Sequence, residues 1–569
     1  MRPPTLSEQL HPLACLAEVR GAADATDLRT AIAMLDRLAP AERARLEERL
    51  SEPLSEDPLD IPPAAAWRLR ELAAGRGDVA LRASRAGLPT LLRRLLELRS
   101  IDEQEAVALA HDLQVVTLLD LRDALEDRRI DGLSTPAAGR LRKAEAIIAA
   151  EIRPMRLGRA AEILSSVQDL IAHHCPQLED VLPAGDVRRF EPLVSQLTLV
   201  GHSPVPPAAI AALCAMPGVD DVVHRSRRRV LLWVHNVEVD VRVSADDDYG
   251  TVLFAATGST AHVRAVTARR PAALHGSEDL VYAHAGLSFV PAEMRNDTGE
   301  IEAAAAGSVP HLVSRADIRG DLHMHSTYSD GHDTLTTMVA ACAALGYEYI
   351  AITDHSERAA ASRTLTLDAL ARQRDEILRL QAQYPQIAIL HGLEVDILPD
   401  GRLDFADAIL EQLDIVLASL HDAAKQDGPA LTRRCLQAIR HPLVNVITHP
   451  ANQLVGRRPG YPLDFEAVYA AAADTGTALE IDGAPSHLDL DGEHARGAVA
   501  AGATVTIDSD CHRAGALDRQ MKLGIGTARR GWVEPRHVLN CRPVDQVLAF
   551  IQAKRRGRPA GPIGPQPAC

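Results

Sequence analysis

Between residues 320 and 512 the chain has seven short apolar runs, and five of the segments between them have helical spacing. The runs consist mainly of Val, Ile, Leu and Ala, the composition of parallel strands that are buried on both faces. The predicted strands are 320–325, 347–352, 387–390, 415–420, 444–448, 478–481 and 504–507, and the helices are 334–345, 367–384, 431–440, 465–473 and 495–501. Seven such strands in succession, most of them followed by a helix, predict a closed α/β barrel.

Histidine or an acidic residue follows nearly every predicted strand. His323 and His325 lie two residues apart, so on a strand both side chains point to the same side. The C-terminal ends of barrel strands converge on one face. Chance placement of the 23 histidines would scatter them along the strands, so the pattern predicts a metal site on that face. The other strand ends carry Thr353-Asp354-His355, His391-Gly392-Leu393-Glu394, His421, His449-Pro450, Asp482 and Asp508-Ser509-Asp510-Cys511-His512.

The order and spacing of these motifs, across residues 319–540, resemble the PHP (polymerase and histidinol phosphatase) superfamily. The resemblance implies a distorted (βα)7 barrel that holds up to three divalent metal ions, with Glu394 bridging two of them. The groups of ligands that it implies are His323, His325, Glu394 and Asp510 for one ion, Glu394, His421 and His449 for a second, and Asp330, His355 and His512 for the third.

The ligand types also indicate the chemistry. Imidazole and carboxylate donors suit Zn²⁺, Mn²⁺ or Fe²⁺, and geometry rather than raw affinity selects among these ions. Close-set ions activate a water and clamp the attacking and leaving oxygens of an in-line displacement. We therefore predict a hydrolase that acts on phosphoester bonds, with His323, His325, Glu394 and Asp510 as catalytic residues.

The barrel differs from the family pattern at two places. The family usually has Thr-Gly-Arg after its His-Pro pair, where this chain has Ala451-Asn452-Gln453. Arg457 and Arg458 follow a turn later, and they either bind the substrate phosphate or are simply solvated. Asp482 stands where polymerase-linked relatives generally carry Asn, which places a negative charge near the metals.

The N-terminal part is rich in Leu, Ala, Arg and Glu at helical spacing, which predicts a helical domain at 1–95 and a fingers-like region at 96–152. Residues 118–134 resemble the helix-hairpin-helix segments of bacterial family X DNA polymerases, whose Gly-x-Gly turns bring backbone N–H groups to a DNA phosphate. Acids and prolines replace those glycines, so a helical scaffold without DNA contacts fits equally well. The three turns read Ile61-Pro62-Pro63-Ala64, Ser100-Ile101-Asp102-Glu103 and Leu133-Ser134-Thr135-Pro136.

Residues 153–243 resemble the palm of the same polymerases, and residues 244–316 the thumb. Four antiparallel strands are predicted in the palm, at 197–201, 218–224, 230–235 and 237–243. The family binds two metal ions with a Gly-Asp-x-Asp motif, but Gln196 and Thr198 stand where its two acids belong. Asp240 is the remaining acid, and one carboxylate cannot hold two Mg²⁺ ions. The polymerase site is therefore predicted to be degenerate and inactive.

Composition limits the partners that we expect. The net charge of −16 and the aromatic content of 3% are poor signs of general nucleic-acid binding. No apolar run approaches the roughly 18 residues of a membrane span, and the start lacks a signal-peptide core, so no membrane partner is expected. The eight cysteines occur singly, as free thiols of a cytoplasmic protein do. Cys511, between two predicted ligands, is expected to face away from the metals.

Two basic clusters stand out in this acidic chain. Arg225, Arg227, Arg228 and Arg229 either guard an edge strand or contact a nucleic-acid backbone. The run 554–558 belongs to a predicted basic Pro/Gly-rich tail at 546–569, which follows a PHP domain at 317–545.

Three functions from different classes remain open. The first is a metal-dependent 3′–5′ exonuclease or 3′-end processing enzyme that acts on DNA in repair, with a non-catalytic polymerase half. The second is a small-molecule phosphatase of the histidinol-phosphate type, whose partner would be a small phosphorylated metabolite. The third is a DNA-binding scaffold. The fused architecture favours the first, because the relatives that it resembles process DNA ends.

Overall fold

The computed structural model describes residues 4–50, 61–127, 129–132, 135–271, 273–357 and 364–557. These residues form two compact units. Unit 1 comprises the described residues within Met1–Pro154, Ala160–Asp186 and Ser195–Ala285. Unit 2 comprises those within Met155–Arg159, Val187–Val194 and Gly286–Cys569. The finer divisions at residues 95, 152, 243 and 316 stay predictions.

Unit 2 is built around a nearly closed barrel of seven parallel strands. Each strand pairs with the next one along the chain, from β8 to β14. A parallel bridge between Met324 and Cys511 then brings the first and last strand regions together. The predicted (βα)7 barrel is therefore confirmed. The strands are β8 Gly320–Asp321, β9 Tyr349–Ile352, β10 Ala388–Asp396, β11 Ile415–Ser419, β12 Val446–Ile447, β13 Ala478–Asp482 and β14 Val505–Asp508.

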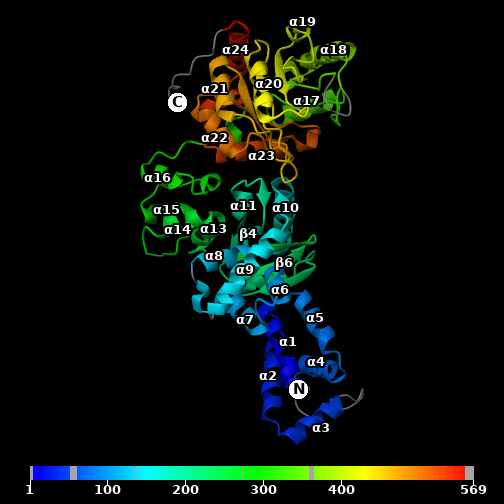
Figure 1. Ribbon diagram of the computed structural model, residues 1–569, viewed down its shortest axis with the longest axis vertical. Coiled ribbons are helices and arrows are strands. Elements are labelled where there is room, and N and C mark those ends of the chain that lie inside the picture. Colours follow the sequence, from blue (N-terminus) through cyan, green and yellow to red (C-terminus); the bar gives the residue numbers. More distant parts are fainter. Residues whose placement is uncertain are drawn as a thin grey trace. The chain divides into compact units, whose positions relative to one another are not determined.

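Helices surround this barrel (Figure 1). Five of them begin after a Thr or Asp whose side chain accepts a hydrogen bond from a backbone N–H of the first turn, namely α17, α18, α20, α21 and α22. Such a cap stabilises a helix by about 1 kcal/mol. The bounds are α17 Leu335–Ala344, α18 Leu367–Gln383, α19 Asp407–Leu410, α20 Gly428–Arg440, α21 Phe465–Thr475, α22 Gly492–Ala500 and α23 Leu517–Arg530, with α16 Glu300–Ala305 earlier in the unit.

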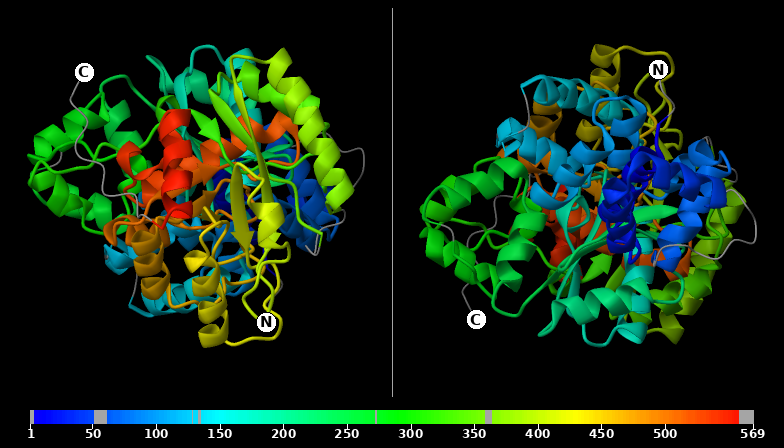
Figure 2. Two further views of the ribbon diagram at one scale, coloured as in Figure 1. Left: turned by 90° about the horizontal axis from the view of Figure 1, so that it is seen from above. Right: turned by 90° about the horizontal axis from the view of Figure 1, so that it is seen from below.

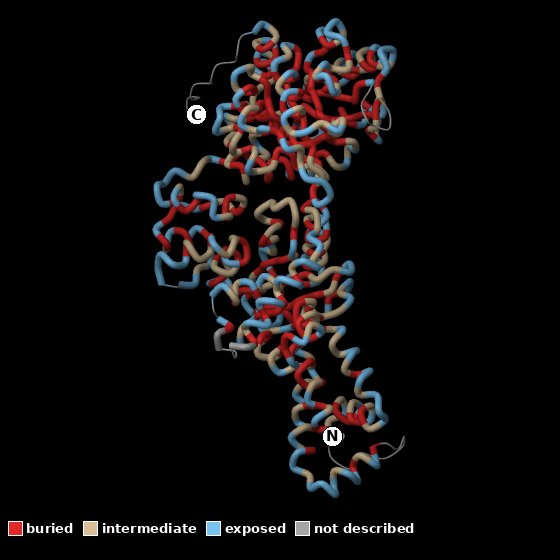
Figure 3. Tube along the Cα trace, viewed as in Figure 1, coloured by how far each residue is buried: buried red, intermediate tan, exposed pale blue. Residues whose placement is uncertain are grey.

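The interior of the barrel is apolar at the end where the strands begin. Tyr349, Ile415 and Ala478, each the first or second residue of its run, pack against Phe550 and Ile551 of α24 (Val544–Arg555). Helix α24 thus closes this end (Figure 2). Buried residues are concentrated along the strands, while the outer helix faces are exposed (Figure 3).

Two predictions for unit 2 need correction. Strand β10 continues to Asp396, so Glu394 lies within the strand and not beyond its end. Residues 546–555, which were predicted to begin a tail, form most of α24. The Lys554 ammonium is buried there and donates to the Ile439 carbonyl, because the apolar face of α24 packs on the barrel. Residues 558–569 lie outside the described part.

Helices of unit 1 confirm the predicted mainly α N-terminal region. At the second predicted hairpin turn, the Asp102 side chain caps α7 and accepts from the N–H groups of Gln104 and Glu105. Those two N–H groups thus donate to a side chain of the same protein. Leu133 and Ser134 of the third turn lie outside the described residues. The helices are α1 Leu6–Arg20, α2 Ala25–Arg37, α3 Pro40–Leu50, α4 Pro63–Ala73, α5 Gly77–Ala86, α6 Thr90–Glu97, α7 Glu103–Val107, α8 Leu118–Glu126 and α9 Thr135–Glu151.

A five-stranded sheet with the order β2-β4-β7-β6-β5 follows in unit 1. Strand β4 pairs parallel with β7, so the prediction of four antiparallel strands is wrong for that pair. Helix α12 connects β4 to β5 and so carries the chain across the sheet. This crossover allows the later strand β7 to pair parallel with β4. The bounds are β2 Glu179–Pro183, β4 Leu197–His202, β5 Asp221–Arg225, β6 Arg229–Val234, β7 Val237–Ser244, α10 Leu157–His174, α11 Gly185–Arg188, α12 Pro206–Cys214, α13 Tyr249–Thr257, α14 Thr260–Thr267 and α15 Glu278–Ala285. The two-residue strands β1 Met155–Arg156 and β3 Leu193–Val194 belong to unit 2. Within the described ranges, no helix combines the length and the apolar character that crossing a membrane needs.

Candidate metal centre

Histidines and carboxylates converge at the C-terminal ends of the barrel strands. A cavity of about 300 Å³ opens there. His323 and His325 are fully buried behind it, where the Nε2 atoms of the two rings lie 3.1 Å apart. The residues that line the cavity are Asp330, His355, Glu394, His421, His449, His487, Asp510 and His512. All nine predicted ligands thus lie in or directly behind one cavity.

Glu394 lies at the centre of this cluster. Its Oε2 atom is 2.8 Å from His355 Nδ1 and 3.5 Å from His323 Nε2. Its Oε1 atom is 3.2 Å from His421 Nε2 and 3.1 Å from His449 Nε2. The two oxygens of one carboxylate therefore face two different groups of imidazoles, which is the arrangement that a bridging ligand requires.

The donor atoms cluster in groups that differ in part from the groups implied by the resemblance. Within each group the donor atoms lie within 4.8 Å of one another. His325 joins the Asp330 group as well as the Asp510 group, and His355 joins Glu394 as well as Asp330. The assignment of each residue to an ion therefore stays a prediction. The groups are His325, Asp330, His355 and His512; His323, His325 and Asp510; and His355, Glu394 and His421.

Several buried donor atoms of the cluster fit bound cations. His325 Nδ1, His355 Nδ1 and Glu394 Oε2 are buried, and although the last two lie 2.8 Å apart, none of the three makes a hydrogen bond of good geometry among the described residues. Leaving such atoms unpaired costs about 1–3 kcal/mol each, whereas a metal ion would satisfy them. The backbones of His449 and Asp510 also have φ angles of 26° and 47°, which residues with a side chain rarely adopt. Strain of this kind is typical of functional sites.

The charges of the cluster are strongly coupled. Burial alone would raise the pKa of Glu394, but the surrounding histidines hold it well below its usual range. Burial alone would lower the pKa of His421, but Glu394 and Asp396 raise it to about 10. When no metal ion is bound, these two carboxylates thus favour the protonated form of His421. Binding of a divalent cation would therefore release protons.

Three residues that support the ligands are absent from the sequence prediction. Glu480 Oε1 is 2.6 Å from His323 Nδ1, and Glu480 Oε2 accepts from the backbone N–H of His449. Asp396 Oδ1 is 2.5 Å from His421 Nδ1. His487 stacks on His449 with ring centroids 5.3 Å apart. The sequence does carry a sign of the role of Glu480, because an acid inside the apolar run 478–481 is unusual. It carries none for His487, which lies in a loop without periodicity.

The remaining predicted residues occupy varied positions. Arg457 is exposed, while Arg458 donates to the carbonyl and side-chain oxygens of Asn452 and so braces the loop. Neither arginine lines the cavity, so their contact with substrate stays a prediction. Asp482 is fully buried and accepts from the Ala484 N–H. Cys511 is buried in the core, with its thiol directed to the Arg513 carbonyl and away from the cavity.

In unit 1, arginines form ion pairs with Asp240, the remaining acid of the predicted polymerase centre. Arg229 makes two hydrogen bonds of 2.8 Å to the Asp240 carboxylate, and Arg242 adds a third at 3.0 Å. Burial alone would raise the pKa of Asp240, but these arginines hold it below its usual range. Gln196 Nε2 donates to Asp240 and to Thr198, each at 3.2 Å. The atoms that would bind Mg²⁺ are thus engaged in hydrogen bonds and ion pairs.

Comparison with known proteins agrees with this architecture. Residues 321–453 match the family model described as PHP domain. The DNA polymerase/3′-5′ exonuclease PolX of Bacillus subtilis is 33% identical over 496 residues, which cover 82% of this chain and 85% of that protein. The chain belongs to the PolX family. A probable phosphatase of Shewanella oneidensis is 33% identical over 220 residues, which cover 36% of this chain and 81% of that protein.

Membership of the PolX family and the PHP match make this protein a hydrolase of phosphoester bonds. Its clusters of histidines and carboxylates have the donor atoms and spacing that could hold divalent metal ions. Among solved structures, histidinol phosphate phosphatase from Lactococcus lactis, in complex with zinc, L-histidinol and phosphate, covers 37% of this chain and 93% of its own, at 21% identity and a TM-score of 0.31.

Because Glu480 orients His323, we expect Glu480→Gln to weaken metal binding by about 10–100-fold, the usual loss when a partner of a metal-bound histidine is removed. Titration of the metal-free protein, with the metal content measured on each sample, tests this. Glu348→Gln, an exposed exchange in the same unit, is the control. Unchanged affinity in Glu480→Gln would show that Glu480 has no positioning role.

We expect no template-directed nucleotide addition from the polymerase-like unit, because Gln196 and Thr198 replace two metal ligands and Asp240 is ion-paired. Primer extension with all four nucleotides and Mg²⁺ or Mn²⁺ tests this in Glu394→Gln, where the products are not degraded. Extension by this variant that is lost on adding Asp240→Asn would contradict the prediction.

We expect Asp240→Asn to lower the free energy of unfolding of unit 1 by about 1.5–3 kcal/mol, because the buried Arg229 guanidinium loses one charged partner and retains Asp120 as its counter-charge. Urea denaturation at neutral pH measures the loss. The lowered pKa means that the carboxylate contributes stability above its ordinary pKa, and that this contribution disappears as the pH falls through the folded value. The difference between variant and wild type should therefore shrink in acid. Asp247→Asn, at an exposed acid, should have no such effect.

Proposed function

We propose that this chain is a metal-dependent 3′–5′ exonuclease or 3′-end phosphatase that acts on DNA in repair, with unit 1 as a non-catalytic platform. The observation that carries the proposal is the convergence of nine histidines and carboxylates on one cavity, in a chain that aligns along most of its length with a DNA polymerase/3′-5′ exonuclease. The ion pairs of Asp240 support the assignment of catalysis to unit 2 alone.

The proposed cofactors are up to three ions of Zn²⁺, Mn²⁺ or Fe²⁺. His323, His325, Glu394 and Asp510 would hold one, Glu394, His421 and His449 a second, and Asp330, His355 and His512 a third. When bound, such ions polarise a water and neutralise the oxygens of a phosphoryl group. This assignment agrees with the central position of Glu394 between two sets of imidazoles.

The residues of this chain have separate parts in the reaction. Glu480 and Asp396 hold the rings of His323 and His421 by their Nδ1 atoms, so that Nε2 of each ring faces Glu394. Asp354 accepts from Ser326 and Ser329 and so fixes the loop that carries Asp330. A cavity of about 300 Å³ admits a terminal nucleotide or a small phosphomonoester.

Purified protein with Mn²⁺, given 3′-labelled DNA and histidinol phosphate in parallel, tests the proposal. We expect release of nucleotides or phosphate from the DNA 3′ end at a kcat/KM at least tenfold above that for histidinol phosphate. The reverse preference would favour the second candidate, a small-molecule phosphatase, which the match of 36% of this chain to a probable phosphatase supports. A 5′-labelled, 3′-blocked DNA shows whether a free 3′ end is required.

A further inference from the structure

One residue that lines the metal-centre cavity of unit 2 is outside the predicted set of ligands. Of the eight described residues that line this cavity, seven are predicted ligands and the eighth is His487, in the loop between β13 and α22. The Nε2 atoms of His421 and His449 lie 3.2 Å and 3.1 Å from Glu394 Oε1. No ion pair joins His487 to a carboxylate in the described part of the chain. Its imidazole is therefore available to a molecule that enters the cavity.

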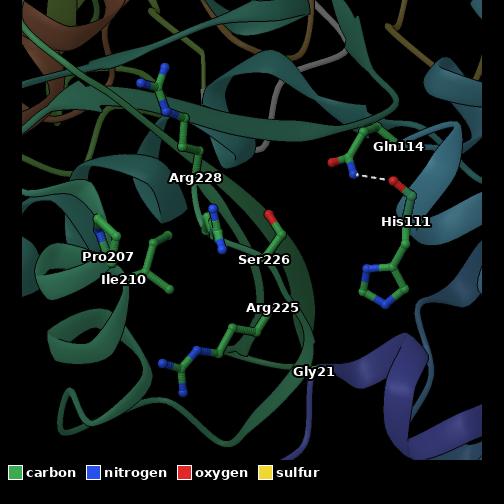
Figure 4. Close-up of a pocket in the computed structure, with 9 residues that line it drawn as sticks. Gly21, His111, Gln114, Pro207, Ile210, Arg225, Ser226 and Arg228 are labelled. Atoms are coloured by element: carbon green, nitrogen blue, oxygen red, sulfur yellow. Dashed lines mark hydrogen bonds between the residues drawn. The ribbon is translucent and has the colours of Figure 1, made fainter.

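The described wall of the metal-centre cavity consists of histidines and acids, without a lysine or an arginine. Arginines line a different cavity, of about 760 Å³ in unit 1, where Arg225 and Arg228 lie on the β5–β6 hairpin (Figure 4). Ions bound by the seven predicted ligands would hold oxygens of the phosphoryl group. Oxygens on the alcohol side of the scissile bond lie beyond that group. Among the described lining residues, His487 is the one left to contact them.

The ring of His487 is held in place, yet the protein does not use its full capacity for hydrogen bonds. It stacks on His449 with the ring centroids 5.3 Å apart and an angle of 24° between the planes. This contact covers one face of the ring and leaves its edge, which carries both nitrogens. Nδ1 makes no hydrogen bond of good geometry among the described residues. A neutral imidazole has one donor and one acceptor nitrogen, so it can bind ester, ether or hydroxyl oxygens.

Hydrogen bonds fix the loop that carries His487. The backbone N–H of His487 donates to the Ala484 carbonyl at 2.9 Å. Gln453 Nε2 donates to the Leu488 carbonyl, also at 2.9 Å, and so ties this loop to the segment that follows His449. A side chain that is already ordered loses little conformational entropy when it contacts a ligand. The loop therefore presents the imidazole in a fixed position beside the cavity.

We propose that His487 is a substrate-contacting residue, which forms a hydrogen bond with an oxygen on the alcohol side of the scissile phosphoester bond. The substrate class that this contact favours is the phosphoester of a sugar or another aliphatic alcohol. An aryl phosphate such as p-nitrophenyl phosphate gains little from it, because the electrons of its ester oxygen are delocalised into the ring and no sugar oxygen follows. The inference rests on the proposed function only in taking the 3′-terminal sugar of DNA as that alcohol.

Three variants of the full chain separate this contact from the support that stacking gives to His449. His487→Phe keeps a ring against His449 but has no atom for a hydrogen bond, and His487→Leu is a second apolar variant. His487→Gln keeps a donor and an acceptor without a ring. The matched control, His311→Phe, makes the same exchange at an exposed position of unit 2. Metal content and melting temperature are measured on every sample.

Steady-state kinetics with Mn²⁺ compare 3′-labelled DNA, histidinol phosphate and p-nitrophenyl phosphate as substrates. We expect His487→Phe and His487→Leu to lower kcat/KM for the DNA 3′ end at least tenfold, which corresponds to about 1.4 kcal/mol. The same variants should lower kcat/KM for p-nitrophenyl phosphate less than threefold. On DNA, His487→Gln should keep at least three times the kcat/KM of His487→Phe. Metal content should equal that of the wild type throughout, and the control should match the wild type on every substrate.

Two results would overturn the inference. One is wild-type activity of His487→Phe on its preferred substrate, which would reduce His487 to a stacking partner. The other is an equal loss on all three substrates, with or without a lower metal content, which would place its role at the metals or the phosphoryl group. The proposed function fails separately. If the wild type prefers histidinol phosphate to DNA, a loss with histidinol phosphate that is absent with p-nitrophenyl phosphate still supports the contact. If wild type and His487→Phe cleave DNA equally, the proposed function stands alone.

Discussion

Glu394→Gln should lower the phosphoesterase kcat by at least about 100-fold, which corresponds to about 2.7 kcal/mol of activation free energy. One Glu394 oxygen faces His421 and His449 and the other faces His355, so the exchange removes a negative charge shared by both sets of imidazoles. The fold should survive, because the barrel buries its apolar strands independently of this side chain. Steady-state kinetics with Mn²⁺, together with the metal content and the melting temperature of each sample, test this.

Asp240→Asn is the contrasting variant for that experiment. It lies in unit 1 and should leave hydrolysis within about threefold, well under 1 kcal/mol, at temperatures where the protein is folded. Near-native activity of Glu394→Gln with native metal content would contradict the bridging role. Loss of hydrolysis in folded Asp240→Asn would place the active centre in unit 1 and overturn the division between the units.

Removal of divalent metal should reduce phosphoester hydrolysis to the background rate and lower the melting temperature of unit 2. The loss of activity follows because no other described group of the cavity supplies comparable charge to a phosphoryl group. The loss of stability follows because ligands that bind only the folded state stabilise it by mass action. Dialysis against a chelator, then calorimetry and assays with each ion restored singly, measures both effects.

Recovery should depend on the ion, with Mn²⁺, Zn²⁺ or Fe²⁺ restoring activity and Ca²⁺ restoring little, since imidazole-rich sites favour the former ions. The control is Glu394→Gln, whose activity no ion should restore to the wild-type level. Full activity in protein whose measured metal content is negligible would contradict the metal centre.

The sequence by itself determined the barrel and the inventory of donor atoms. Parallel strands with both faces buried read as uninterrupted apolar runs, and their C-terminal ends converge, so polar residues at those ends had to meet. His323, His421 and Asp510 could be named for that reason. The sequence also predicts that the polymerase centre is inactive, because Gln196 and Thr198 lack the carboxylates that would bind Mg²⁺.

Only the tertiary structure decided which partner each side chain meets. In the sequence, the positions of Glu480 and Asp396 do not reveal their partners. In the fold, β13 and β10 place them against His323 and His421. The arginines 225–229 form one cluster in the sequence, but the pairing of β6 with β7 turns Arg229 toward Asp240 and leaves three others at a cavity. Contacts between segments distant in the chain depend on register and packing, which local patterns of polarity do not encode.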